Sequence, residues 1–158
     1  MDGSFMDTSG KAGGGLVRDH AGNLLVAFAT PVEAQSALEA ELLAIHHGII
    51  LAMEFRRPNW IEVDADQAVK LLNGPSWGPA SLCRVMARIA THKRQQVTRM
   101  TFIHREGNKA ADWLAKMGLE GTSFQRMYTS TAPRLLKALV RLDARGVPHI
   151  RIQTEEEE

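Results

Sequence analysis

The sequence contains few of the features that mark secreted or membrane-spanning proteins. Cys83 is the single cysteine among 158 residues, which excludes an internal disulfide and favours a reducing compartment. No apolar run approaches the length of a membrane span, and the N-terminus lacks a basic segment followed by an apolar one. We therefore expect an intracellular protein, nuclear or cytoplasmic, that does not enter a membrane.

Aromatic residues and net charge are also scarce. Phe, Trp and Tyr make up 6% of the chain, and the formal net charge is +1. The last four residues are all glutamate, so the remainder of the chain is modestly basic. A modestly basic domain is compatible with a polyanionic partner, although many proteins with this charge bind no polyanion. The length and the 44% share of hydrophobic residues predict one soluble domain with a core.

The pattern of apolar residues predicts a mixed α/β sheet. Two strand-like runs, 16–19 and 24–29, flank a Gly-Asn turn and indicate a hairpin. An apolar stripe at helical spacing then indicates a helix over 33–55. The later expected elements are a strand at 60–64, helices at 66–72 and 80–95, a strand at 97–103, a helix at 109–116, an irregular stretch at 118–131, a helix at 133–142 and an extended piece at 147–152. Parallel pairing is expected where a helix separates two strands.

Four carboxylates stand at the ends of different expected elements: Asp2, Glu41, Asp64 and Asp112. At about 100° per residue, Glu41 lies at the edge of its helix's apolar stripe, beside small residues, whereas Glu39 points to the opposite side. An acid directed at a packed flank needs a partner, and a shared cation would supply one. Each acid also has an ordinary structural interpretation. Asp64 can cap the helix that follows it, with Asp66 as a competitor for that position.

The four acids offer oxygen ligands only, and the chain shows no His or Cys cluster with zinc spacing. Such a set favours Mg²⁺ or Mn²⁺. Two such ions would activate a water and stabilise the leaving oxygen in phosphodiester cleavage.

Four motifs resemble type 1 ribonuclease H in their order and spacing. They are Asp2-Gly3-Ser4, Ala40-Glu41-Leu42-Leu43-Ala44, Ile61-Glu62-Val63-Asp64 and the run from His104 to Asp112. The sequence is most similar to the plant, reverse-transcriptase-associated form found in LINE-type retrotransposons. The resemblance implies a ribonuclease H-like α/β fold: a five-stranded mixed sheet, with three antiparallel strands first and parallel strands after, flanked by helices. We expect this domain to cover 1–153 and to be followed by an acidic tail, 154–158.

The resemblance also implies an activity, since family members are endonucleases that hydrolyse the RNA strand of RNA–DNA hybrids with two Mg²⁺ ions, for which Mn²⁺ can substitute. The catalytic and metal-binding residues carried across are Asp2, Glu41, Asp64 and Asp112. The expected substrate-binding residues are Gly3, Ser4, Gly14, Arg105 and Asn108. Small residues can reach the shallow minor groove of a hybrid, although the glycines at 13–15 suit a bulge or the close approach of another backbone equally well. The implied protein is a monomer or part of a larger reverse-transcriptase polyprotein.

Departures from the family pattern leave alternatives open. Only Met1 precedes Asp2, where the family's central first strand has several residues, so we expect a shortened first strand. The alternative function is a catalytically weak or silent RNA-binding, hybrid-binding or protein-interaction domain of retrotransposon origin. His104 and Arg105 compete for one role beside the substrate. Arg84, Arg88 and His92 follow one helix face and could contact phosphates, but such a row also suits a solvated surface.

Overall fold

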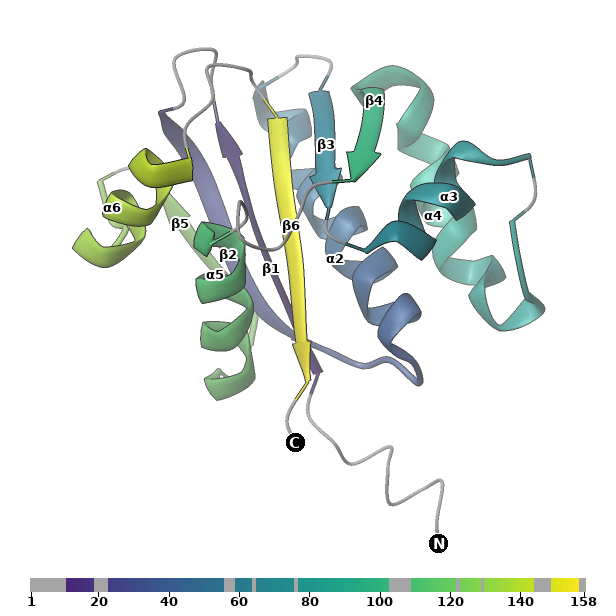
Figure 1. Ribbon diagram of the computed structural model, residues 1–158, viewed down its shortest axis with the longest axis horizontal. Helices are drawn as coiled ribbons and strands as arrows, with labels where there is room; N and C mark the ends of the chain where they lie inside the picture. Colours follow the sequence, from purple (N-terminus) through teal and green to yellow (C-terminus); the bar gives the residue numbers. More distant parts are fainter. Residues whose placement is uncertain are drawn as a thin grey trace, which may run out of the picture.

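The computed structural model of the chain describes residues 11–18, 23–55, 59–63, 65–75, 77–102, 109–121, 123–128, 130–143 and 149–156. These residues form one six-stranded sheet with helices on both faces (Figure 1). The strands are β1 (Lys11–Arg18), β2 (Leu24–Val32), β3 (Asn59–Val63), β4 (Val97–Phe102), β5 (Gln125–Tyr128) and β6 (His149–Glu156). Their order across the sheet is β4-β3-β6-β1-β2-β5.

The strand pairing confirms the predicted hairpin and the mixed sheet, but corrects the number of strands. β1 and β2 pair antiparallel, and β3 and β4 pair parallel. The sheet has six strands rather than five, partly because β5 lies in a stretch expected to be irregular. β5 contains a single buried residue, Met127, so its apolar pattern is too sparse to indicate a strand.

The last described strand, β6, occupies one of the two central positions of the sheet, beside β1. It pairs antiparallel with β1, where Gly14 lies opposite Gln153, and parallel with β3, where Val63 lies opposite Ile152. β6 also extends into the expected acidic tail, since its last residues, 154–156, pair with β1. The first strand with Asp2 was expected at the centre of the sheet, and residues 1–10 lie outside the described part of the chain.

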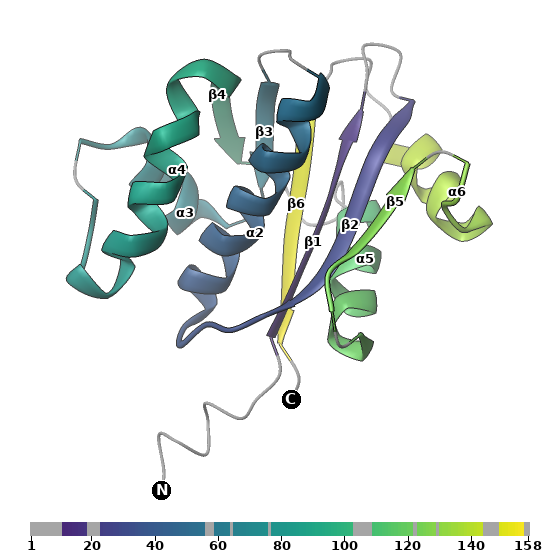
Figure 2. The same ribbon diagram turned by 180° about the vertical axis from the view of Figure 1, so that it is seen from behind.

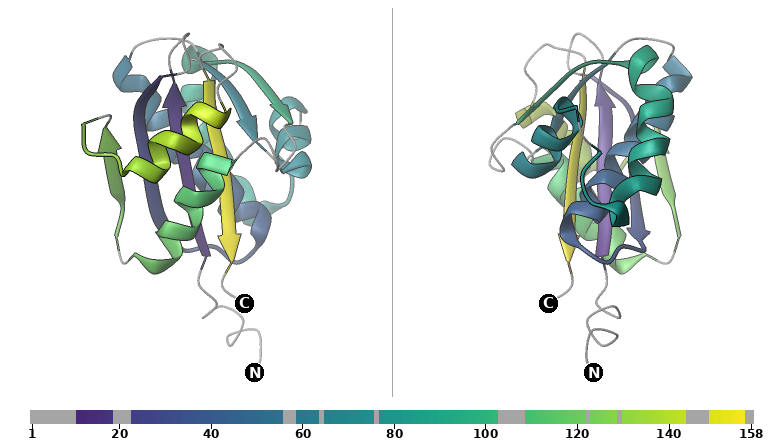
Figure 3. Two further views of the ribbon diagram at one scale, coloured as in Figure 1. Left: turned by 60° about the vertical axis from the view of Figure 1, so that its left-hand side comes forward. Right: turned by 90° about the vertical axis from the view of Figure 1, so that its right-hand side faces the viewer.

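The helices are α2 (Ala37–Ala52), α3 (Asp66–Asn73), α4 (Cys83–Gln96), α5 (Lys109–Glu120) and α6 (Arg134–Asp143), with the 3-10 turns η1 (Met53–Phe55) and η2 (Ala80–Leu82). α2 and α4 cover one face of the sheet, and α5 and α6 cover the other (Figures 1 and 2). The two side views show the sheet between these layers (Figure 3). No helix in the described ranges is long and apolar enough to cross a membrane.

α2 begins four residues later than expected, because Ser36 stops the helix from extending towards Glu33. Ser36 has extended backbone angles, with φ −149° and ψ 161°, and its Oγ accepts a hydrogen bond from the backbone N–H of Glu39 at 3.0 Å. A serine in this position satisfies one of the free donors at a helix start.

Alternation along the strands divides the core into two layers. Val17 and Phe28 face the layer shared with α2, α3 and α4, which also contains Ile152 from β6. Leu16 and Ala27, their neighbours in sequence, face the layer shared with α5 and α6. Successive strand residues point to opposite faces, so each central strand holds both helical layers. Neighbouring residues of one strand can therefore position groups on opposite sides of the sheet.

Candidate active site

Glu41 is held in the interface between α2 and the sheet. The residue is 3% exposed, and Ala40, Ala44 and Gly48 on the same helix are also buried. This confirms the prediction from helical geometry that Glu41 points to a tightly packed flank. Glu39 lies on the other side of α2, where its Oε1 accepts a hydrogen bond from the backbone N–H of Gln35 at 2.7 Å. The two glutamates therefore have different environments, although they are two positions apart.

Gly13 explains why α2 lies so close to the sheet. A Cβ atom added at Gly13 would lie 2.7 Å from the Cβ of Ala44, which is nearer than real Cβ contacts allow. Ala44 follows Glu41 by about one helical turn, so the same close contact fixes the height of Glu41 above β1. Gly13 thus positions a carboxylate by having no side chain.

Asp112 lies in the first turn of α5, as predicted. Its Oδ2 is 3.1 Å from Nζ of Lys116, and the Asp112 side chain is 23% exposed. The Lys116 side chain is 62% exposed, so water screens this ion pair and it contributes little to stability. A carboxylate in the first turn also interacts favourably with the positive end of the helix dipole.

Gly14 is buried beneath α5 and does not line an open surface. A Cβ atom added there would lie 2.4 Å from the backbone N of Ala115 and 2.5 Å from the backbone C of Leu114. The expected substrate contact of Gly14 is therefore corrected: its role in the structure is the close approach of a second backbone. α2 and α5 thus cross β1 at consecutive glycines from opposite faces, and each helix carries one predicted acid (Figures 1 and 2).

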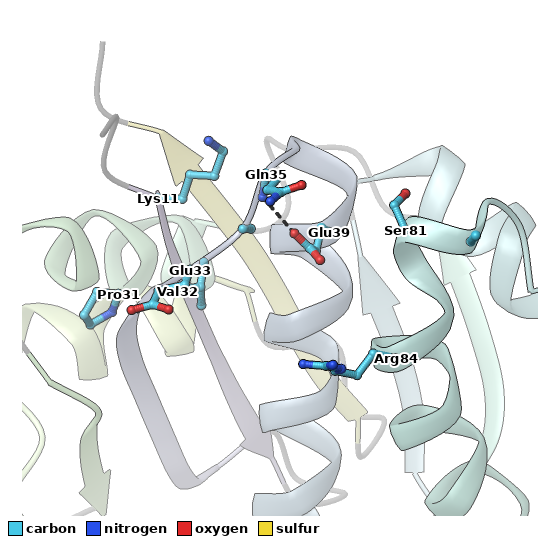
Figure 4. Close-up of a pocket in the computed structure, with 10 residues that line it drawn as sticks. Lys11, Pro31, Val32, Glu33, Gln35, Glu39, Ser81 and Arg84 are labelled. Atoms are coloured by element: carbon cyan, nitrogen blue, oxygen red, sulfur yellow. Dashed lines mark hydrogen bonds between the residues drawn. The ribbon is translucent and has the colours of Figure 1, made fainter. Parts of the chain in front are cut away.

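A groove lies between α2 and α4, beside the start of both helices. Its larger part has a volume of about 820 Å³ and is lined by Lys11, Glu33, Glu39 and Arg84, among others. A smaller part of about 390 Å³ shares Glu33, Glu39 and Arg84 and continues to Arg88. Figure 4 shows Arg84 extending from α4 towards α2. Two members of the row predicted on α4, Arg84 and Arg88, therefore border a concave surface, and His92 is not among the lining residues.

Three histidines gather on the same two helices. The ring centroids of His46 and His92 are 6.1 Å apart, and those of His46 and His47 are 6.4 Å apart. Burial, followed by the nearby charges of His47, His92 and Arg88, lowers the pKa of His46 to about 4. The ring of His46 is therefore neutral at pH 7. Only the packing of α2 on α4 joins His46 to His92, so no pattern within the sequence indicates this cluster.

A comparison with models of protein families identifies the family of the chain. A family model described as reverse transcriptase-like matches residues 1–118. The chain belongs to this family. No curated protein and no solved structure matches it. The family is ribonuclease H-like and includes domains of retrotransposon-type proteins, which confirms the resemblance found in the sequence and associates the domain with nucleic acid.

The matched segment of this reverse transcriptase-like domain contains all four predicted acids. Glu41 and Asp112 lie in the described structure. Apart from Gly14, the other predicted site residues lie outside it: Asp2, Gly3, Ser4, Asp64, Arg105 and Asn108, together with His104. β3 ends one residue before Asp64, and α5 begins one residue after Asn108. Within the described ranges, no group of three or more His, Cys, Asp or Glu side chains could hold a metal ion.

Proposed function

We propose that this reverse transcriptase-like domain is an endonuclease that hydrolyses the RNA strand of RNA–DNA hybrids. The observation that carries the proposal is the buried carboxylate of Glu41, held against the sheet by the contact of Gly13 with Ala44. A carboxylate held at a fixed place beside the sheet of a ribonuclease H-like domain is a candidate metal ligand. Asp112 supports the proposal from the other face of the sheet.

The chemistry of the acids fits magnesium. Glu41 and Asp112 present carboxylate oxygens, the donors that Mg²⁺ prefers. With Asp2 and Asp64 they would hold two Mg²⁺ ions, for which Mn²⁺ could substitute. Bound ions would supply an activated water and a stabilised leaving oxygen. The protein's own contribution is positional: the close contact of α2 with β1 places Glu41 beside the sheet, and the first turn of α5 carries Asp112.

Substrate recognition is assigned to residues beside the acids. Gly3, Ser4, Arg105 and Asn108 would contact the hybrid, whose A-form-like shape and 2′-hydroxyls distinguish it from DNA. Arg105 would contact phosphate, which its guanidinium can bind in a bidentate manner. Gly14 has no part in this contact, because α5 covers it.

The test is a cleavage assay on labelled RNA–DNA hybrid, RNA–RNA and DNA–DNA duplexes with Mg²⁺ or EDTA. We expect cleavage of the hybrid only, with no cleavage in EDTA. Asp112→Asn should abolish cleavage, whereas Asp66→Asn should not. Asp66 is a matched control, because it also lies in the first turn of a helix and pairs with a lysine four residues on, Lys70, at 2.9 Å. Equal loss in both variants, or activity that survives EDTA, would contradict the proposal.

Glu41→Gln gives a readout that does not depend on turnover. A ligand that binds the folded state raises stability, so Mg²⁺ should raise the melting temperature of the wild type and not that of Glu41→Gln. Glu120→Gln, at the exposed end of α5, should keep the wild-type response. A Glu41→Gln variant that responds to Mg²⁺ like the wild type would remove Glu41 from the site.

The second candidate is a domain that binds the hybrid without cleaving it. The position of β6 in the sheet favours this candidate. The strand with Asp2 was expected at the centre of the sheet, where β6 lies between β1 and β3. Gln153 and Ile152 of β6 stand opposite Gly14 and Val63, so an acid on another strand cannot occupy this place at the same time. Metal-independent binding of the hybrid without any cleavage would select this candidate.

A further inference from the structure

Exposed hydrophobic side chains gather where α2 and η1 lie beside β5, at one edge of the sheet (Figure 2). Six residues form this area, which we call the β5 surface: His47, Ile50, Glu54, Phe124, Arg126 and Tyr128. Of these, Ile50, Phe124 and Tyr128 are each 39% exposed. More than a third of each of these hydrophobic residues is therefore open to solvent.

Contacts between a helical row and a strand row make the β5 surface continuous. The three residues from α2 and η1 follow one another at three- and four-residue spacing, so they share one face. The three residues beside and within β5 alternate along the chain, so they point to one side of the sheet. The ring centroids of His47 and Phe124 are 5.2 Å apart. Nη1 of Arg126 is 2.8 Å from Oε1 of Glu54, and Ile50 lies between these two contacts.

The β5 surface is ordered by its own contacts. The ring of Phe124 stacks on the buried ring of Phe28, with centroids 5.8 Å apart and an interplanar angle of 6°. Arg126 donates a hydrogen bond to the hydroxyl of Tyr128 at 3.0 Å, and this hydroxyl donates one to Glu54 at 3.5 Å. The polar groups therefore keep partners when water is excluded, and a binding partner has few side chains to immobilise.

The chemistry of the β5 surface favours a protein partner over a nucleic acid. Phosphates are bound by cations, and the guanidinium of Arg126 is already paired with the carboxylate of Glu54. Exposed aromatic residues together with arginine are typical of the centres of protein interfaces. The β5 surface therefore has the composition of a contact between proteins.

Backbone pairing at the outer edge of β5 is limited. β5 is four residues long, and the backbone N–H of its last residue, Tyr128, donates to Oγ1 of Thr131 at 2.9 Å. The C=O of Tyr128 accepts from the backbone N–H groups of Thr131 and Ala132. A short edge that is closed by its own turn offers an added strand few partners. A folded surface therefore fits the side chains of the β5 surface better than an extended peptide.

The charges of the β5 surface suit a second copy of this chain. α4 contains no acidic residue, and Arg84 and Arg88 are exposed on it, so two copies repel each other where these helices meet. On the β5 surface the charges of Arg126 and Glu54 balance. A two-fold axis through this surface places Arg126 of each copy beside Glu54 of the other. The β5 surface is therefore complementary to itself.

We propose that two copies of this chain associate through the β5 surface about a two-fold axis, with Ile50, Phe124 and Tyr128 at the centre of the contact. The hydrophobic centre is small, so the association is weak and reversible, of the kind made by the smaller protein interfaces. This dimer replaces the monomer implied by the resemblance in sequence. The inference does not depend on the proposed function, because association is measured without cleavage or metal.

The first experiment is sedimentation velocity of the full chain from micromolar to millimolar concentration. The wild type should dimerise reversibly as its concentration rises. Ile50→Lys should raise the dissociation constant about tenfold or more, because it removes a central hydrophobic side chain and brings like charges together across the axis. The matched control is Leu135→Lys, which adds the same charge at a leucine that is 55% exposed on α6, on the other face of the sheet. This control should dimerise like the wild type.

Reversing the charges tests the two-fold axis. Arg126→Glu leaves only acids at the ion pair, and Glu54→Arg leaves only arginines, so each variant alone should stay monomeric where the wild type dimerises. An equimolar mixture of the two should dimerise again, because opposite charges then face each other. Lys70→Glu is the control, since it disrupts an exposed ion pair with Asp66 on α3 and should leave the dimer intact. Far-UV circular dichroism and melting temperatures show that all the variants are folded.

Several outcomes would overturn the inference. One is a wild type that stays monomeric up to millimolar concentration. Equal weakening by Ile50→Lys and Leu135→Lys would reduce the effect to added charge. A mixture of the reversed variants that remains monomeric would remove the two-fold contact. A monomeric wild type that binds single-stranded RNA more tightly than Tyr128→Ala does would assign the β5 surface to nucleic acid instead.

Discussion

Gly13 and Gly14 are adjacent in sequence and contact different helices. A side chain on Gly13 would meet Ala44 of α2, and one on Gly14 would meet the backbone of α5 at Leu114 and Ala115. The two positions differ in what could move aside. At Gly13 the nearest atom belongs to a side chain, whereas at Gly14 it belongs to a helical backbone. The second contact is therefore the less tolerant one.

Gly14→Ala should destabilise the protein by about 1–3 kcal/mol, the usual cost of overpacking a core, because α5 must shift away from β1. Gly121→Ala is the control, since the one atom that its added Cβ would crowd is the terminal Nε2 of Gln125, at 2.7 Å, and the next described atoms lie at an ordinary 3.7 Å. That substitution should change stability by no more than about 0.5 kcal/mol. Urea denaturation checks both values, and equal effects of the two substitutions would contradict the packing described for Gly14.

The lowered pKa of His46 predicts that the protein loses stability in acid. Its pKa is lowered from 6.5 to about 4 in the folded protein, mainly by burial. Between these values the unfolded chain binds a proton that the folded protein does not, so folding is favoured as pH rises. The contribution is complete above about pH 6.5 and is lost as pH falls towards 4. As pH falls through this range, the urea midpoint of unfolding should decrease less steeply for His46→Gln than for the wild type. The same dependence of the midpoint on pH in both proteins would contradict this assignment.

Glu41 shows how far single residues could be predicted. Its direction follows from the periodicity of one helix, which is local information, and the structure confirms it. The environment of Gly14 depends on which helix lies over β1, and α5 is distant in sequence from that strand. A local pattern could name close backbone approach as one possibility but could not choose it over contact with substrate.

At the scale of elements, α2 depends on the cap at its first turn. Ser36 accepts the hydrogen bond of the Glu39 N–H, and Glu39 in turn accepts that of the Gln35 N–H. These two bonds satisfy donors that a helix start otherwise leaves to water. Because α2 carries Glu41 and one wall of the groove beside α4, the cap supports the position of both.

Ser36→Ala should cost about 1 kcal/mol, because the first turn of α2 loses a capping acceptor. Ser81→Ala is a suitable comparison, since Ser81 is exposed and forms no hydrogen bond with a described residue. Its effect should stay within about 0.5 kcal/mol. Thermal unfolding followed by circular dichroism gives both values. A Ser36→Ala protein as stable as the wild type would show that the cap contributes little.

Helices and strands with a strong period of apolar residues were predictable from the sequence. An element that is defined by the strand it pairs with was not. The hairpin, α2 and the helices after β3 all follow from apolar spacing within their own residues. β5 has one buried side chain and, among the described strands, pairs with β2 alone, so its identity as a strand comes from its neighbour. The expected start of α2 at Glu33 was wrong because the capping hydrogen bonds of Ser36 end the extended segment after β2.

At the scale of the whole molecule, β6 joins the two halves of the sheet. It is the only described strand that pairs with both β1 and β3, and the side chain of Ile152 is completely buried in the layer beneath α2. An extended piece near the C-terminus was predictable, but its insertion between β1 and β3 is a long-range property. Strand order depends on contacts between distant segments, which periodicity does not record.

Ile152→Ala should destabilise the protein by about 2–5 kcal/mol, because it removes buried methylene groups at the centre of the sheet. Ile50→Ala removes the same atoms from a residue that is 39% exposed on α2. Alanine favours a helix, so this control should be nearly neutral. Guanidinium unfolding measures the difference. Similar costs for the two substitutions would argue against a central position of β6.

The position of β6 also has a consequence for synthesis on the ribosome. β1 and β3 emerge early, but the strand that separates them emerges only after α6. Until then the facing edges of β1 and β3 expose unpaired backbone groups, which can pair with any other extended chain. The nascent domain must therefore keep two strand edges apart from foreign partners while all five of its described helices are already made.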